Sequence, residues 1–201
     1  EGPQPAGATR LAQVMRPWFV IPLAGWAIIF GTHTVINAFM GLMWTAQGIG
    51  LDMIGLLFAV SAVSESIMFF VFSKIAPRFR ARSIILGSAV LTVLRWVAMA
   101  MAPDLPWLFV LQSLHGLTYA AGFLACMSFI TRWTSEEIAA EAQGFFVALQ
   151  QAMAMASLYG FGWLMGHVGP AAWWGAAGFA LVGTGAIWWS WRLPPPDGKI
   201  A

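Results

Sequence analysis

Ionisable side chains interrupt the apolar stretches of this sequence at a few positions. Glu65, Arg95 and His115 each lie within a run of hydrophobic residues, and His33 lies within another, with Asn37 one helical turn later. An ionisable group at mid-membrane is costly, so it normally faces a protein interior and has a partner or a function. These residue types can exchange protons and bind a polar solute. They therefore indicate a transport pathway more readily than a hydrolytic site.

The helical rise places three of these groups at similar depths. Counted from the basic ends of their helices, Glu65 lies roughly 12 Å deep, Arg95 roughly 18 Å and His115 roughly 24 Å. All three fall in the central band of a bilayer, where long side chains can interact if their helices are neighbours. We therefore predict that Glu65, Arg95 and His115 form one interacting group on the pathway.

The spacing of polar residues predicts which helix faces line a cavity. In four helices these residues recur at intervals of three, four or seven, which places them on one face. The stripes are Gln112, His115, Thr118, Tyr119 and Gly122; His33, Asn37 and Trp44; Gln143, Gln150 and Ser157; and Ser61 with Glu65. From these stripes and the buried cation, the predicted substrate contacts are His33, Asn37, Trp44, Arg95, His115, Tyr119 and Gln150.

Each of these features also has a structural interpretation. Glu65 and Arg95 could form an ion pair that only holds two helices together. His33 and His115 could be interhelical hydrogen-bonding groups, and the glutamine stripe could reflect packing. An enzyme has no support, because the sequence contains no HExxH, GxSxG or Walker motif and no Cys/His cluster with metal-ligand spacing. We expect neither a metal site nor a cofactor.

The elements that carry these residues are too apolar for a soluble protein. Charged residues make up 9% of the 201 residues, hydrophobic residues 60%, and mean hydropathy is +0.76, whereas an ordinary globular chain has about 25% charged residues. Six stretches are long and apolar enough to cross about 30 Å of hydrocarbon as helices. They are residues 18–43, 53–72, 84–101, 107–130, 142–165 and 171–191. The sequence thus predicts an all-α polytopic membrane protein with a six-helix bundle over residues 18–193.

Positive charges predict the orientation of this bundle. Nine of the ten Lys and Arg fall at the ends and loops of one side, and the opposite loops contain only Asp52, Asp104 and His167 as ionisable groups. Cytoplasmic loops are enriched in cations, so both termini are expected in the cytoplasm, with residues 1–17 as a linker and 194–201 as a tail. The net charge of +2 gives no footprint for nucleic acid. Tryptophans near span ends are expected to form an interfacial belt: Trp18, Trp44, Trp107, Trp133, Trp173, Trp174, Trp189 and Trp191.

Motifs in several spans resemble the major facilitator superfamily, specifically the C-terminal six helices of its phenylpropionate-permease-like group, which is related to lactose permease. The first two spans are similar to that group's seventh and eighth helices. His33, Trp44 and Glu65 have counterparts there, although the usual proline after the buried glutamate is absent here. The segment FSKIAPRFRARS resembles the basic loop between that group's eighth and ninth helices. The ninth and tenth helices are similar to VLRWVAMA and LQSLHGLTYAAGF, and the start of the eleventh is similar to SEEIAAEAQGFF.

This resemblance implies an inner-membrane, proton-coupled symporter of a small organic solute, such as an aromatic acid, a sugar or a nucleoside. Such transporters have twelve helices in two halves with the substrate site between them, so the chain is expected to be a C-terminal half partnered by the N-terminal six helices. Glu65, Arg95 and His115 match the charged set that lactose-permease-like symporters use for proton coupling and substrate binding, which implies the same roles here. Thr118 stands where those proteins have a second carboxylate, so the expected coupling site is Glu65, with a carboxylate of the N-terminal half as its rival. Two other functions stay open: a non-transporting membrane scaffold or assembly subunit, and a proton-independent six-helix facilitator.

Overall fold

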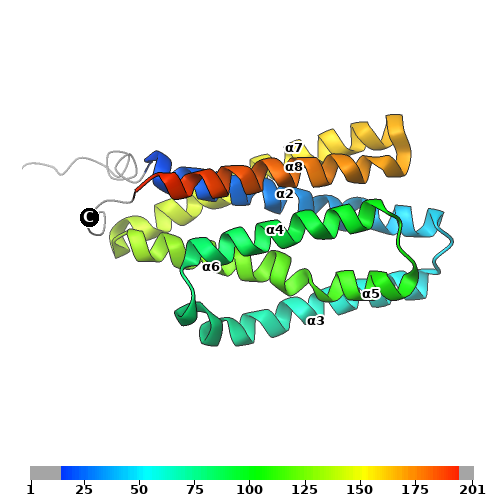
Figure 1. The fold of residues 1–201 in the computed structure, drawn as a ribbon, viewed down its shortest axis with the longest axis horizontal. Helices are drawn as coiled ribbons and strands as arrows, with labels where there is room; N and C mark the ends of the chain where they lie inside the picture. The colour runs from blue at the N-terminus through cyan, green and yellow to red at the C-terminus, as the bar shows by residue number, and fades with distance from the viewer. Residues whose placement is uncertain (1–14, 195–201) are drawn as a thin grey trace, which may run out of the picture.

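The computed structural model of the protein describes residues 15–194, which are almost entirely helical (Figure 1). The main helices are α2 (Pro17–Ala46), α3 (Leu51–Ile75), α4 (Ala81–Ala100), α5 (Leu105–Ser113), α6 (Ala121–Trp133), α7 (Glu136–Val168) and α8 (Ala172–Trp189). Short helical turns are η1 (Ala76–Arg78), η2 (Gly116–Ala120), η3 (Gly169–Ala171) and η4 (Ser190–Arg192). The all-α prediction is confirmed for residues 15–194, in which no β-strand occurs. Most of the predicted linker and tail, at residues 1–14 and 195–201, lies outside the described residues.

Proline and glycine set the boundaries of the long helices. Pro17 opens α2, where its missing N–H removes no intrahelical hydrogen bond. Gly48 follows the end of α2 with φ 81°, and Gly169 follows the end of α7 with φ 57°. Both angles lie in the left-handed region that favours glycine. These two turns allow α3 and α8 to run back along the bundle.

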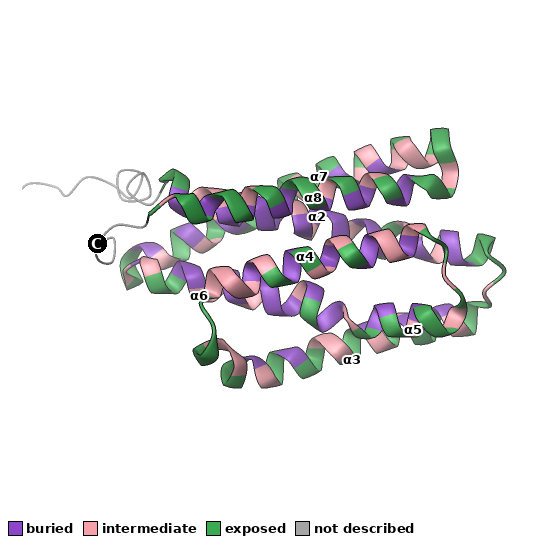
Figure 2. Cartoon of the chain, in the orientation of Figure 1, coloured by how far each residue is buried: buried purple, intermediate pink, exposed green. Residues whose placement is uncertain are grey.

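Helix α2 has the largest buried share of the four apolar stretches. It packs along α7 and α8, while α4 packs against α8 and α6, and α3 packs against α5 and η2. Figure 1 shows α2, α7 and α8 along one side, α4 and α6 in the middle, and α3 and α5 along the other side. Figure 2 shows the consequence for burial: α2 is buried along much of its length, whereas α3 is mostly exposed. In their most apolar stretches, 67% of α2 residues but only 17% of α3 residues are buried.

Four helical stretches among the described residues are long and apolar enough to cross a membrane. They are α2, α3 with η1, α4, and the continuous stretch from α5 to α6. Helices α7 and α8 match the last two predicted ranges in position but are not in this set. Polar and glycine residues in α7, and glycine and tryptophan in α8, lower their hydropathy. The protein is a multi-pass membrane protein by these four stretches, and the count of six spans stays a prediction.

Positive charge gathers at one end of the bundle. Figure 1 shows that the α3–α4 and α6–α7 connections and both ends of the described chain lie there. The α2–α3, α4–α5 and α7–α8 connections lie at the opposite end. The described cations of the first end are Arg16, Lys74, Arg78, Arg80, Arg82, Arg132 and Arg192. The charge separation expected from the sequence is therefore present in the described part of the fold. We call the end of the bundle that carries these cations the basic end.

Three of the eight tryptophans expected at the membrane interface are instead part of the core. Trp18, Trp44 and Trp173 are each less than 10% exposed. Their rings pack edge-on or tilted against other aromatic rings of the bundle. Position near the end of a span therefore does not decide whether a tryptophan faces lipid. The packing of the neighbouring helix decides it.

Candidate functional site

A fully buried arginine forms the inner end of the candidate site. Arg95 on α4 is 1% exposed, and no carboxylate of the described residues forms an ion pair with it. Its Nη2 donates to Gln112 Oε1, and its Nη1 donates to Thr118 Oγ1 at 3.0 Å and to His115 Nδ1 at 3.1 Å. Its Nε has no partner. Neutral acceptors satisfy most of the guanidinium N–H groups but leave its charge uncompensated.

His115 connects this arginine to Glu65 on α3. The Nε2 atom of His115 lies 3.5 Å from Glu65 Oε2, and Nδ1 of the same ring accepts the hydrogen bond from Arg95. Because a guanidinium nitrogen only donates, Nδ1 must be unprotonated, and we assign the proton of the neutral ring to Nε2, which faces the carboxylate. The three groups thus form a row from the buried cation outward to Glu65, whose side chain is 31% exposed.

A second branch joins Arg95 to His33 on α2. The Thr118 hydroxyl accepts from Arg95, and its Oγ1 lies 3.3 Å from His33 Nε2. The other ring nitrogen, Nδ1 of His33, donates to a backbone carbonyl one turn earlier at 3.0 Å. Tyr119 completes the group: its ring stacks on His115 at 5.1 Å between centroids and lies 5.5 Å from the His33 ring. Side chains from four different helical stretches therefore form one connected group.

An irregular turn between α5 and α6 places two of these side chains. The five residues of η2 form a π-helical turn, a distortion that is frequent at functional sites. Ser64 of α3 fixes this turn, because its hydroxyl donates to Ser113 O and accepts the backbone N–H of Gly116 at 2.9 Å. A Cβ on Gly116 would lie 2.8 Å from Ser64 Oγ, so glycine is needed for α3 to approach this closely.

The connected group faces a cavity of about 210 Å³ between α2, α3 and η2. Five predicted site residues line it: His33, Asn37, Glu65, His115 and Tyr119. Arg95 lies behind this wall and acts on the cavity through His115. The remaining lining residues are Phe30, Thr34, Ile36, Phe58, Ser61 and Ala62. Aromatic rings and hydrogen-bonding groups therefore share one small space.

Besides Arg95, two predicted substrate contacts lie outside this cavity. Trp44 is buried near the end of α2, with its ring 5.8 Å from that of Phe58. Gln150 on α7 is buried, and its Nε2 has no partner. Ser157, seven residues later in the same stripe, lies so close to Gly31 of α2 that a Cβ there would overlap its hydroxyl. At this point the α7 stripe serves helix packing rather than the cavity.

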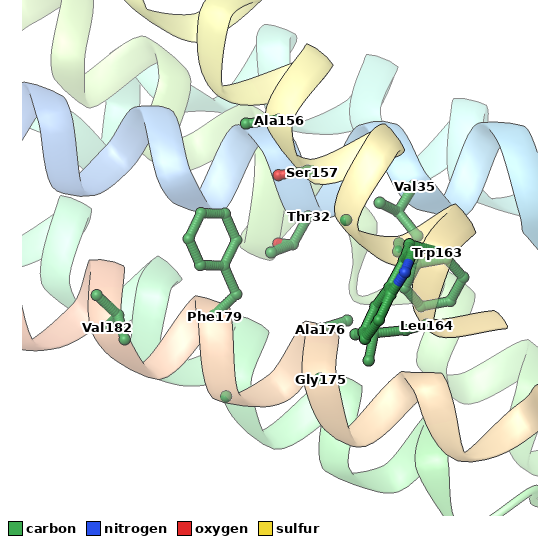
Figure 3. A pocket seen from close by; sticks show the side chains of 13 residues that line it. Thr32, Val35, Ala156, Ser157, Trp163, Leu164, Gly175, Ala176, Phe179 and Val182 are labelled. Atoms are coloured by element: carbon green, nitrogen blue, oxygen red, sulfur yellow. The ribbon is translucent and has the colours of Figure 1, made fainter. Parts of the chain in front are cut away.

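A larger cavity lies elsewhere, between α2, α7 and α8 (Figure 3). Its volume is about 590 Å³, and no ionisable residue lines it. The hydroxyls of Thr32 and Ser157 and the indole of Trp163 are its only polar side-chain groups among the described residues. It offers no group that could exchange a proton or hold a charged solute. The smaller cavity is therefore the candidate site.

Gln112, Thr118 and Ser64 hold the site together but were not among the predicted site residues, although the first two belong to the predicted polar stripe of His115. Gln112 and Thr118 lie three residues before and after His115, so they share its helix face, and a buried arginine needs such acceptors. That combination is a usable signal in the sequence. Ser64, which fixes the π-helical turn, carries no such signal. Within residues 15–194, no group of three His, Cys, Asp or Glu side chains could hold a metal ion.

Comparison with known proteins gives a family for this fold and site. The MFS_1 like family matches residues 6–176. The chain is 31% identical over 187 residues to the probable 3-phenylpropionic acid transporter of Escherichia coli (strain K12). The matched region covers 89% of this chain and 49% of that protein. The chain thus spans about half the length of this curated relative. No solved structure matches the chain. Because the family model matches most of the chain and the relative is 31% identical over 89% of it, the chain belongs to the MFS_1 like family, in the phenylpropionate-permease-like group of the major facilitator superfamily.

Proposed function

We propose that the chain is the C-terminal half of a secondary transporter that moves a small organic acid together with a proton. The observation that carries this proposal is the row Arg95–His115–Glu65, which runs from an uncompensated buried cation to the wall of a small cavity. A desolvated cation attracts an anion strongly. The similarity to a probable 3-phenylpropionic acid transporter supports an aromatic acid over a sugar or a nucleoside.

The walls of the cavity suit a ring that carries a carboxylate. The rings of Phe30, Phe58 and Tyr119 line it, and offset or edge-to-face contacts with such rings stabilise a bound aromatic group. His115 presents its Nε2–H toward the same space, and His33 and Asn37 line the wall contributed by α2. We place Arg95 as the group that orients His115 and supplies the positive potential.

Proton coupling in this proposal comes from competition for one hydrogen-bond donor. When Glu65 is ionised, its carboxylate lies against His115 Nε2 and partly balances the positive charge of Arg95. When Glu65 is protonated, that negative charge is gone. The carboxylate of the substrate then takes its place at His115 without like-charge repulsion. One proton on Glu65 thus accompanies each bound anion.

Transport requires a second half in this proposal, because Asn37 is exposed and Glu65 is partly exposed at the cavity, and both need a cover. An N-terminal six-helix half provides it, and rocking of the two halves about the site exposes the cavity to each side in turn. Helices α7 and α8 then span the membrane with the other four stretches. The basic end lies in the cytoplasm of a cell with this protein in its inner membrane.

Replacing Glu65 by glutamine in the transporter that contains both halves tests the coupling. We expect Glu65→Gln to lose accumulation of radiolabelled 3-phenylpropionic acid against a gradient but to keep counterflow. Glutamine is neutral like a protonated glutamate and permits anion binding, but it carries no proton. Uptake into proteoliposomes with an imposed proton gradient and counterflow without one measure the two activities. Asp52→Asn, an exposed neutralisation at the start of the same helix, is the matched control and should behave as wild type.

Three results contradict the proposal. Continued uphill accumulation by Glu65→Gln excludes Glu65 as the coupling group. Wild-type transport that ignores the proton gradient identifies a facilitator instead of a symporter. If the wild type shows neither accumulation nor counterflow of 3-phenylpropionic acid, the aromatic-acid assignment is wrong. If it transports no other organic solute either, the result favours the scaffold alternative.

A further inference from the structure

A third cavity, lined by cations, lies at the basic end of the bundle. Its volume is about 370 Å³, and three arginines line it, Arg80, Arg82 and Arg132. The remaining lining residues are Ala81, Phe129, Trp133, Trp191, Leu193 and Pro194. Among residues 15–194, no carboxylate lines this cavity or forms an ion pair with the three arginines. We call it the arginine pocket.

Arg82 builds the floor of the arginine pocket. Its Nη2 donates to Trp18 O at 2.6 Å, and its Nη1 donates to Ser190 O at 3.3 Å and Leu193 O at 3.5 Å. The guanidinium also lies 5.4 Å from the centroid of the Phe129 ring. These contacts hold the start of α2, the start of α4 and the end of α8 together. They fix the cation in place without neutralising it, because every acceptor is an uncharged carbonyl.

The start of α4 adds further positive potential at the same place. The helix begins at Ala81 after Arg80, with no side-chain cap and no acidic residue in its first turn. The first backbone N–H groups of a helix have no intrahelical partner, and they favour an anion placed at the helix N-terminus. Arg80 and Arg132 are exposed beside it, so their guanidinium groups are free to turn toward a ligand.

The aromatic residues of the arginine pocket indicate where the anion comes from. Trp133 and Trp191 line it and lie at the ends of helices. Tryptophan at such a position sits at the level of the lipid headgroups, with its apolar body toward the acyl chains. A soluble anion gains nothing from these rings. A phospholipid can place its phosphate among the arginines and its glycerol and upper acyl chain against the indoles.

We propose that the arginine pocket binds the phosphate of an anionic phospholipid at the basic end of the bundle. Basic pockets between membrane helices are suited to such headgroups. The site is separate from the cavity around His115, and it does not depend on the transport proposal. A lipid bound here contacts the start of α4, the end of α6 and the turn after α8, and so stabilises the packing that the contacts of Arg82 hold together.

Lipid binding to the purified chain tests this proposal. In native mass spectrometry from detergent, we expect the wild type to bind phosphatidylglycerol in preference to phosphatidylcholine with the same acyl chains. The double variant Arg80→Gln/Arg132→Gln should weaken phosphatidylglycerol binding roughly thirtyfold, because each cation at a membrane surface contributes about fivefold. The matched control is Lys74→Gln/Arg78→Gln, which removes two exposed cations of the same end outside the pocket and should keep the preference.

Two further measurements separate the alternatives. Arg80→Lys/Arg132→Lys retains the charge and should recover most of the preference, which a general loss of folding would not permit. Inorganic phosphate at the same concentration should not displace phosphatidylglycerol. Displacement by inorganic phosphate would overturn the lipid assignment in favour of a soluble anion. Equal losses in the pocket variant and the control would overturn the site itself.

Discussion

Arg95→Met is expected to abolish both accumulation and counterflow of 3-phenylpropionic acid in the two-half transporter. Methionine matches the length of the arginine stem but removes every donor and the charge. His115 then has no donor to its Nδ1, so the Nε2–H tautomer that faces Glu65 is no longer fixed. Removing one partner of a buried charged hydrogen bond typically costs about 2–5 kcal/mol of binding, so substrate affinity should fall at least about thirtyfold.

The contrast with Glu65→Gln makes this result informative. Glu65→Gln separates counterflow from accumulation, whereas Arg95→Met removes both, since Arg95 acts on binding and Glu65 on the proton. Arg95→Lys should remain impaired, because an ammonium group cannot reproduce the fork that reaches both Gln112 and His115. Arg78→Gln, an exposed change at the basic end, controls for the loss of one positive charge.

Measuring both counterflow and the amount of folded protein for Arg95→Met decides whether Arg95 acts in binding or only in structure. If Arg95→Met is recovered in normal amount and still exchanges substrate, the arginine only joins α4 to the α5–α6 helix. That result restores the structural interpretation of the buried charges. It would leave Glu65 and His115 to be explained without a positive potential behind them.

The sequence predicted the membership of the charged group but not its order. The helical rise placed Glu65, Arg95 and His115 at one depth, and the structure brings all three into a single row. A direct contact between Glu65 and Arg95 was one expectation, yet His115 lies between them. Depth follows from the number of residues along a helix. The side that a residue presents to a neighbour depends on how the helices rotate and pack, which one sequence does not contain.

The predicted polar stripes show the same limit. The stripe of His115 and Tyr119 faces the cavity, but the stripe of Gln150 and Ser157 runs where α7 meets α2. Polar residues seven positions apart occur equally well on a cavity-lining helix face and in a contact between two helices. The distinguishing feature is the small partner Gly31 on the other helix, and it becomes visible only when α2 and α7 are known to be neighbours. The π-helical turn is likewise absent from any periodicity in the sequence.

A substitution at the contact between α2 and α6 is expected to have the second large effect, a loss of stability. Trp26 on α2 is fully buried, and a Cβ on Gly122 of α6 would overlap the six-membered part of its indole. Gly122→Ala therefore requires either the tryptophan or one helix to move. Overpacking of this kind costs about 1–3 kcal/mol. We expect the upper part of that range, because the overlap is with the rigid ring of a buried residue and not with the end of a flexible side chain.

Unfolding of the purified chain in detergent by heat or denaturant measures this loss of stability. Gly144→Ala is the matched control: it lies inside α7, nothing lies within 4 Å of its Cβ position, and alanine there should stabilise the helix by about 0.5–1 kcal/mol. Adding Trp26→Phe removes the part of the ring that the new methyl overlaps, so the double variant should be more stable than the sum of the single changes predicts. Additive losses would mean that Gly122 and Trp26 do not meet.

The functional consequence of the same change follows from its position. Gly122 lies one helical turn after Thr118, whose hydroxyl lies 3.3 Å from His33 Nε2. A methyl group that pushes α2 away from α6 lengthens this contact first. The row from Arg95 through His115 to Glu65 joins α4, the α5–η2 stretch and α3 without α2, so it is affected less. Gly122→Ala protein that remains folded should therefore bind substrate more weakly yet still couple the bound substrate to protons. Loss of coupling with unchanged affinity would instead place His33 and Thr118 on the proton pathway.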